Sequence, residues 1–153
     1  MKTIPKLLKL ALLLSAFNLT LQAADLINQA GASHVGLGGY DPVAFFSEGR
    51  PVHGDPGLKA GHQSVTYFFA SESHRQRFLA APDRYVPQYG GYCAFGVSVG
   101  ALFPVDVATW QILDGKLYLV LNPEVRKAFD QDPSGTIAKA EKNWPGLVRK
   151  NSN

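Results

Sequence analysis

Residues 64–79, with the sequence SVTYFFASESHRQRFL, indicate the fold more clearly than any other stretch of the chain. Their first half is rich in β-branched and aromatic residues, which favour a strand. Successive side chains of a strand point to opposite faces, so Val65, Tyr67 and Phe69 share one face, which we expect to lie in the core.

A helix is expected directly after this strand. Ser71 is a favourable N-cap, and the helix runs to about Leu79. His74 and Phe78 are four residues apart and therefore share one helix face, so an inward Phe78 places His74 inward as well. A further short helical turn is expected at residues 82–85, where a proline takes the first position.

One hairpin and several short helices are expected in the C-terminal half. Apolar runs on both sides of Asp114-Gly115 predict a β-hairpin over residues 110–120. Residues 90–100 favour a short helix that ends at a glycine, although their alternation also fits a strand. Two later helices are expected, one from Asn122 and one from about Thr136 to Pro145.

Turns dominate the residues before the first strand. Asp41 is expected to cap a short helix, and residues 47–61 contain several Gly and Pro residues with a short strand around Val52. No internal repeat stands out. The elements together predict a small single domain of the α+β class, with a short antiparallel sheet or hairpins and several short helices.

The first 24 residues have the pattern of a secretory signal peptide. A basic n-region precedes a short apolar stretch and small residues at Ala23 and Ala24. The apolar stretch is shorter than the ~20 residues of a transmembrane helix, and an uncleaved membrane anchor is the alternative. We therefore expect a periplasmic or secreted protein without a stable membrane anchor. We divide the chain into a signal peptide (1–24), a lead-in (25–35), a domain (36–147) and a C-terminal tail (148–153).

Charge and cysteine content exclude several classes of protein. The chain carries 15 Lys and Arg against 12 Asp and Glu over 153 residues. Cleavage of the signal peptide removes Lys2, Lys6 and Lys9, which leaves equal numbers of basic and acidic residues. A nucleic-acid partner then lacks electrostatic support. Cys93 is the only cysteine, which excludes an intramolecular disulfide and any multi-cysteine zinc or iron–sulfur centre.

Several motifs in their order along the chain resemble the YHS domain family, in its longer exported bacterial branch. The resemblance rests on the strand, turn and helix of residues 67–78 and on the Pro-x-x-Tyr step at 82–85. It also rests on the segments GYDPVAFF (39–46), YGGYCA (89–94), DGKLYL (114–119) and AKAEKNWP (138–145). The likeness covers about residues 36–147. It implies a small α+β domain related to TRASH-type metal-binding modules, which are associated with copper and other soft metals.

The resemblance also indicates where a metal site is expected. TRASH-type modules typically carry cysteines at the end of the strand and early in the helix, and the matching positions here are Ala70 and His74. Cys93 is the remaining sulfur of the mature chain. Thiolate is a soft ligand and imidazole a common second one, so the predicted site binds Cu(I) through Cys93 with His74, or with His62 as second choice.

Each of these residues has another interpretation. A buried Cys93 acts as a small hydrophobe, and a Cys93 near a helix N-terminus favours redox or mixed-disulfide chemistry. His74 also fits a hydrogen-bonded helix histidine. His34, His53 and His62 occur in loop-like segments and match no short metal motif. Tyr85, Tyr89, Tyr92 and Trp110 are expected as core and rim aromatics, with the lining of a ligand cleft as the alternative.

Two hypotheses of function follow. The first is an exported, non-enzymatic YHS-like binding protein that holds a soft metal such as copper through Cys93 and a histidine. The second is a structural or protein-interaction domain with Cys93 in the core, no metal, and a periplasmic protein as partner. No hydrolase or metalloprotease motif is present, and Asp41 is interpreted as a helix cap rather than a catalytic acid. Solvent exposure of the Cys93 sulfur discriminates between the hypotheses.

Overall fold

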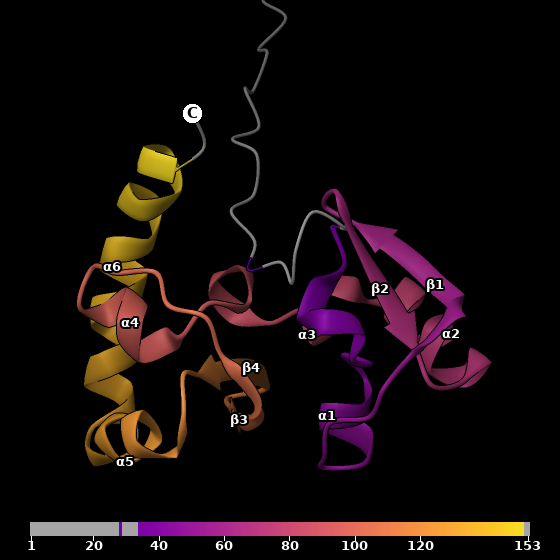
Figure 1. Cartoon of the computed structure of the whole chain (residues 1–153), viewed down its shortest axis with the longest axis horizontal. Coiled ribbons are helices and arrows are strands. Elements are labelled where there is room, and N and C mark those ends of the chain that lie inside the picture. Colours follow the sequence, from indigo (N-terminus) through magenta and orange to yellow (C-terminus); the bar gives the residue numbers. More distant parts are fainter. Residues whose placement is uncertain (1–27, 29–33, 152–153) are drawn as a thin grey trace, which may run out of the picture.

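Two antiparallel hairpins with short helices around them form the molecule (Figure 1). The computed structural model describes residues 28 and 34–151. Six α-helices and two small two-stranded sheets make a small single-domain α+β arrangement, which confirms the predicted fold class. The expected signal peptide, most of the lead-in and the last two residues of the tail lie outside the described residues.

The N-terminal elements include the first hairpin. In chain order they are η1 (Gly36–Gly39), α1 (Ala44–Ser47), β1 (Asp55–His62), β2 (Val65–Phe69), α2 (Glu72–Ala80) and α3 (Pro82–Tyr85). The C-terminal elements include the second hairpin. They are η2 (Gln88–Gly91), α4 (Ala94–Ser98), β3 (Asp106–Leu113), β4 (Lys116–Val120), α5 (Pro123–Gln131) and α6 (Pro133–Asn151).

The N-terminal and the C-terminal elements form two copies of one structural unit. The match between the copies begins at the glycine-containing turns η1 and η2. Leu37 and Gly38 in η1 have positive φ, and so do Tyr89 and Gly90 in η2. A tyrosine follows each turn, and its backbone N–H donates to the residue three positions earlier. The next residues also match, since the N–H of Asp41 donates to Val52 and the N–H of Cys93 donates to Phe103.

The hairpins match in register as well as in direction. Both are antiparallel, and both turn through two residues of positive φ, at 63–64 and at 114–115. Each has one irregularity in its pairing, between Asp55 and Lys59 in the first and between Asp106 and Trp110 in the second. The segment before each glycine turn forms a parallel bridge to the second strand of its own hairpin.

The helix after each hairpin completes the match. Ser71 caps α2 by accepting from the N–H of His74, and Asn122 caps α5 by accepting from the N–H of Val125. The same helical turn of each copy buries a phenylalanine, Phe78 in α2 and Phe129 in α5. A proline begins the next helix in both copies, α3 and α6. We name the copies repeat 1 (residues 34–85) and repeat 2 (residues 86–151).

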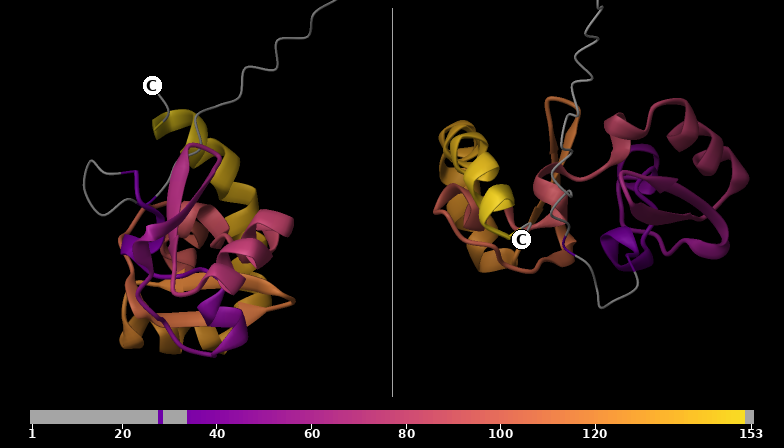
Figure 2. Two further views of the ribbon diagram at one scale, coloured as in Figure 1. Left: turned by 90° about the vertical axis from the view of Figure 1, so that its right-hand side faces the viewer. Right: turned by 90° about the horizontal axis from the view of Figure 1, so that it is seen from above.

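Figure 1 shows the elements of the two repeats side by side along the longest axis, and the view from above in Figure 2 separates them in the same way. The repeat is hard to find in the sequence because few residues are identical at matching positions. Identical pairs include Tyr40 and Tyr92, Tyr67 and Tyr118, and Phe78 and Phe129.

β4 contributes side chains to both hydrophobic clusters of the molecule. Leu117 and Leu119 belong to the first hydrophobic cluster, which otherwise consists of repeat 1 residues. Tyr118 and Val120, on the opposite face of the same strand, belong to the second cluster. Val105 packs against both clusters. A strand buried on both faces joins the repeats into one domain.

Most expected elements are confirmed. The strand at 65–69 buries alternate residues as predicted, and the helices at 72–80, 82–85 and 94–98 lie where they were expected. The second hairpin turns at Asp114-Gly115. Tyr67, Phe69 and Phe78 are buried, whereas Trp110 is only partly buried against the first cluster.

Two expectations about element boundaries were wrong. The first strand is Asp55–His62 rather than a short segment around Val52, and its glycines and proline fit because the sheet has only two strands. The last helix passes Pro145 and reaches Asn151, so residues 148–151 of the expected tail are helical. Trp144 and Leu147, on either side of the proline, pack against the second cluster, and this packing compensates for the missing backbone donor.

Candidate functional site

Cys93 lies in the hydrophobic core of repeat 2. Its side chain is 1% exposed, and its Sγ accepts a hydrogen bond of 3.4 Å from the N–H of Gly96 at the start of α4. The other buried members of its cluster are Tyr89, Ala94, Val97, Tyr118, Val120, Phe129 and Ala140. This surrounding of aromatic and aliphatic side chains is typical of a cysteine that acts as a small hydrophobe.

The predicted histidine ligands lie in repeat 1 and have partners of their own. His62, at the end of β1, bonds through Nε2 to Asp83 at 2.9 Å, and its ring meets Phe78 edge-on. His74 lies on α2 against Asp41. The structure therefore places Cys93 and both histidines in different repeats. Within residues 28 and 34–151, no group of three or more His, Cys, Asp or Glu side chains is arranged to hold a metal ion.

The remaining histidines are more exposed. His53 stacks on the ring of Tyr40, with 3.9 Å between ring centroids, and His34 lies on the surface. Tyr85 and Tyr89 belong to the core, as expected. Burial and the neighbouring Glu141, which accepts a hydrogen bond from the phenol, raise the pKa of Tyr89 well above its usual value.

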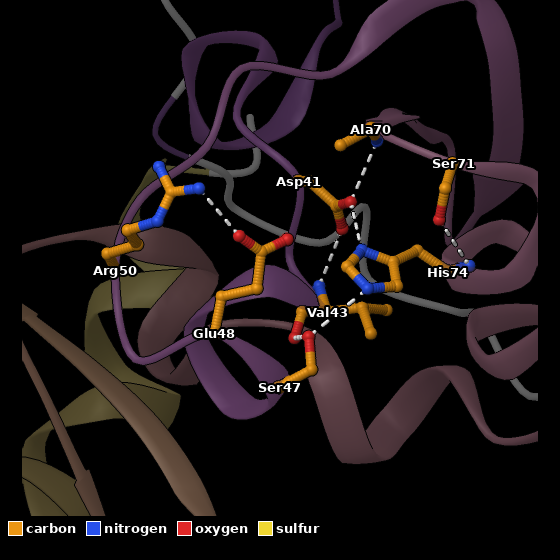
Figure 3. Close-up of polar contacts among 8 residues, drawn as sticks. All are labelled: Asp41, Val43, Ser47, Glu48, Arg50, Ala70, Ser71 and His74. Carbon is orange, nitrogen blue, oxygen red and sulfur yellow. Dashed lines mark hydrogen bonds and ion pairs between the residues drawn. The ribbon is translucent and has the colours of Figure 1, made fainter.

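A network of hydrogen bonds surrounds the carboxylate of Asp41 in repeat 1 (Figure 3). The Asp41 carboxylate is fully buried and accepts three hydrogen bonds. The donors are the N–H of Val43 at 2.8 Å, the N–H of Ala70 at 2.8 Å and Nδ1 of His74 at 2.7 Å. The N-cap of α1 is Val43 rather than the predicted Asp41, whose carboxylate instead holds the turn just before the helix. It also joins this turn to the end of β2 and to α2.

Ser47 completes this network on the solvent side. Its Oγ lies 3.2 Å from Nε2 of His74 and donates to the carbonyl of Val43 at 3.1 Å. An ionised carboxylate only accepts hydrogen bonds, so Nδ1 of His74 carries a hydrogen, and in the neutral ring Nε2 is an acceptor facing Ser47. The sequence analysis missed Ser47, because no short motif links positions 41, 47 and 74.

The second repeat lacks this network. The residues that match Asp41 and His74 are Cys93 and Val125, as the paired turns and capped helices show. Repeat 2 nevertheless forms the same turn, hairpin and helix. Repeat 2 therefore adopts the repeated structure without a buried carboxylate–imidazole pair at the positions of Cys93 and Val125.

A cavity of about 440 Å³ lies at the junction of the two repeats. Repeat 1 contributes Leu37, Gly38 and Tyr40 to its wall, and repeat 2 contributes Gly91, Pro104, Val105, Asp106, Val107 and Leu119; Asn28 also lines it. The volume and the mainly apolar wall are typical of small-molecule sites.

The glycine turns of both repeats meet at this cavity. Leu37 is a buried, non-glycine residue at a φ of 55°, and Tyr89, next to the wall, is another at 53°. Such left-handed backbone costs on the order of 1 kcal/mol per residue and persists where the surrounding structure holds it. Asn28 fixes the second turn, since its N–H donates to Gly90 and its side chain to Gly91.

Comparison with known proteins identified no relative. No family model matches the chain, no curated protein matches it, and no solved structure matches it. Among the residues that the structure describes, no helix is both long and apolar enough to cross a membrane.

Proposed function

We propose that this protein is an exported, non-enzymatic binding domain that holds a small, largely apolar molecule in the cavity between its two repeats. The observation that carries the proposal is the cavity of about 440 Å³ at the junction, built from the glycine turn of each repeat and from β3 and β4. The proposal retains the binding-protein class expected from the YHS-like motifs and replaces the metal with an organic ligand.

The cavity wall also suggests the chemistry of the ligand. Leu37, Val105, Val107 and Leu119 offer apolar contacts. Asp106 is exposed, and its Oδ1 accepts from the N–H of Ala108 at 2.9 Å, which holds the carboxylate at the wall. An acceptor on an apolar wall favours a ligand with one hydrogen-bond donor or cationic group on a mainly apolar body.

The burial of Cys93 favours the core interpretation of this residue over Cu(I) binding. Direct ligation of a metal requires bonds of about 2 Å from sulfur, and the Sγ of Cys93 is enclosed by the second cluster. We therefore assign Cys93 to the core and His74 to the network around Asp41.

A fluorescent apolar amine, N-phenyl-1-naphthylamine, tests the proposal. Its emission rises in an apolar site, and we expect saturable binding to the purified mature protein. Val107→Phe narrows the cavity and should weaken binding at least about tenfold, or 1.4 kcal/mol. Leu79→Phe, at an exposed position on α2 outside the cavity, is the matched control and should bind as the wild type does.

A second probe tests the role of Asp106. Asp106→Ala removes the acceptor and should weaken binding of the amine, whereas binding of 1,6-diphenylhexatriene, which has no polar group, should be unchanged. Equal binding by wild type and Val107→Phe would contradict the cavity as the site. Binding of Cu(I) by the reduced wild type, lost in Cys93→Ser, would instead establish the metal-binding hypothesis.

A further inference from the structure

Asp41, His74 and Ser47 form a constellation that goes beyond ligand binding. A hydroxyl becomes a nucleophile when a base lies within hydrogen-bond reach and a third group orients that base. Here the base is His74 Nε2, 3.2 Å from Ser47 Oγ, and the orienting group is Asp41, 2.7 Å from Nδ1. Figure 3 shows the imidazole of His74 between the side chains of Asp41 and Ser47. Ser47 belongs to α1, His74 belongs to α2, and Asp41 lies just before α1.

We propose that Ser47 is an activated hydroxyl that accepts an acyl group from activated esters, and is thus a covalent modification site of this protein. Ser47 Oγ attacks the ester carbonyl carbon while its proton passes to His74 Nε2. The new O–C bond forms, the bond to the departing alcohol breaks, and the imidazolium returns the proton to that alcohol.

The surroundings of each group suit this step. Ser47 is exposed, so an ester reaches it from solvent, whereas the His74 side chain is only 12% exposed. The Asp41 carboxylate is fully buried and held by two backbone N–H groups besides the imidazole, so its orientation is fixed. The single hydroxyl hydrogen of Ser47 has two acceptors within reach, the Val43 carbonyl and Nε2, and a rotation about the C–O bond moves it between them.

Repeat 2 provides an independent observation. It forms the same unit with Cys93 and Val125 in place of the carboxylate and the imidazole. The backbone of the unit forms without this pair, so in repeat 1 the pair can serve a chemical role beside the exposed Ser47 in addition to its structural one.

A fluorophosphonate probe tests the proposal, because it labels serines that have an adjacent base. We expect the mature protein to be labelled at Ser47, mapped by peptide mass spectrometry, at least about tenfold faster than at Ser73. Ser73 is an exposed serine on α2 of the same molecule and serves as the internal control. Ser47→Ala should abolish the fast labelling.

The base is tested separately. His74→Val introduces the side chain that repeat 2 carries at this place and should slow labelling of Ser47 by about 10² or more, the usual contribution of a general base. A circular dichroism spectrum like that of the wild type confirms that the variant is folded, and His74→Gln serves if it is not. Labelling of Ser47 no faster than Ser73, or equal labelling in a folded His74 variant, would overturn the proposal whatever the outcome of the cavity experiments.

Discussion

At the scale of single residues, Asp41 carries more of the stability of repeat 1 than its partner His74. Asp41→Ala leaves the buried N–H of Val43, the partly buried N–H of Ala70 and an imidazole without their acceptor, whereas His74→Ala leaves the carboxylate two of its three donors. We expect Asp41→Ala to lower the free energy of unfolding by on the order of 3 kcal/mol, and His74→Ala by clearly less. Urea denaturation of both variants gives the comparison, and equal losses would contradict it.

Cys93 offers a second test at this scale. Its Sγ is enclosed by apolar side chains, so the thiol should react with a disulfide reagent such as Ellman's reagent only when the protein unfolds. Cys93→Ser places a hydroxyl in this surrounding and should cost about 1–3 kcal/mol. Cys93→Ala buries no polar atom and should cost less. Rapid reaction of the thiol in the native protein would show that the sulfur is accessible.

At the scale of the elements, the repeat makes a paired prediction. Phe78 in α2 and Phe129 in α5 occupy the same place in their units, and both are fully buried. Replacement of either by alanine should lower the free energy of unfolding by about 3–5 kcal/mol. Urea melts of Phe78→Ala and Phe129→Ala measure both, and Leu79→Ala, at an exposed neighbouring position, is the control.

The elements that local chemistry determines are those that the sequence predicted. Alternation placed the strand at residues 65–69, capping side chains placed α2 and α5, and Asp114-Gly115 placed the second hairpin. Packing decided the rest. Proline lacks a backbone N–H donor, so Pro145 was expected to end the helix. Trp144 and Leu147 pack against the second cluster, and α6 continues past Pro145 to Asn151.

The site was predicted only in part, for a related reason. His74 was expected to face inward from its spacing to Phe78, and Asp41 was expected to begin a helix. Their contact depends on the tertiary fold, which brings residue 41 beside the start of α2, and no local pattern encodes it. The repeat itself is hidden because one unit tolerates both an Asp–His and a Cys–Val pair at matching positions, so the backbone is retained while the side chains differ.

At the scale of the whole molecule, we expect a single cooperative unfolding transition. Leu117 and Leu119 of β4 belong to the first cluster, and Tyr118 and Val120 of the same strand belong to the second, so repeat 1 loses part of its core when repeat 2 unfolds. Fluorescence and circular dichroism melts should therefore coincide for the wild type and for Phe129→Ala. Two separate transitions would show that the repeats fold independently.

The buried tyrosines should make the folded protein less stable at alkaline pH. Burial and the Glu141 carboxylate raise the pKa of Tyr89 above its ordinary value of 10.0, and burial also raises that of Tyr118. The folded state thus favours the neutral phenol. The contribution of these tyrosines to the free energy of unfolding is therefore fully present below pH about 10 and is lost as the pH rises above it. Melting temperatures from pH 8 to 12 should fall for the wild type, and less steeply for Tyr89→Phe. An equal fall in both proteins would contradict the assignment.

NMR of the ¹⁵N- and methyl-labelled mature protein during titration with N-phenyl-1-naphthylamine shows directly whether the ligand binds in the cavity at the junction of the repeats. We predict shift changes concentrated at Leu37, Gly91, Val105, Val107 and Leu119, which come from both repeats. Changes concentrated instead at Val99 and Phe103, the exposed apolar residues beside α4, or no saturable change at all, would show that the cavity is not a binding site for this ligand.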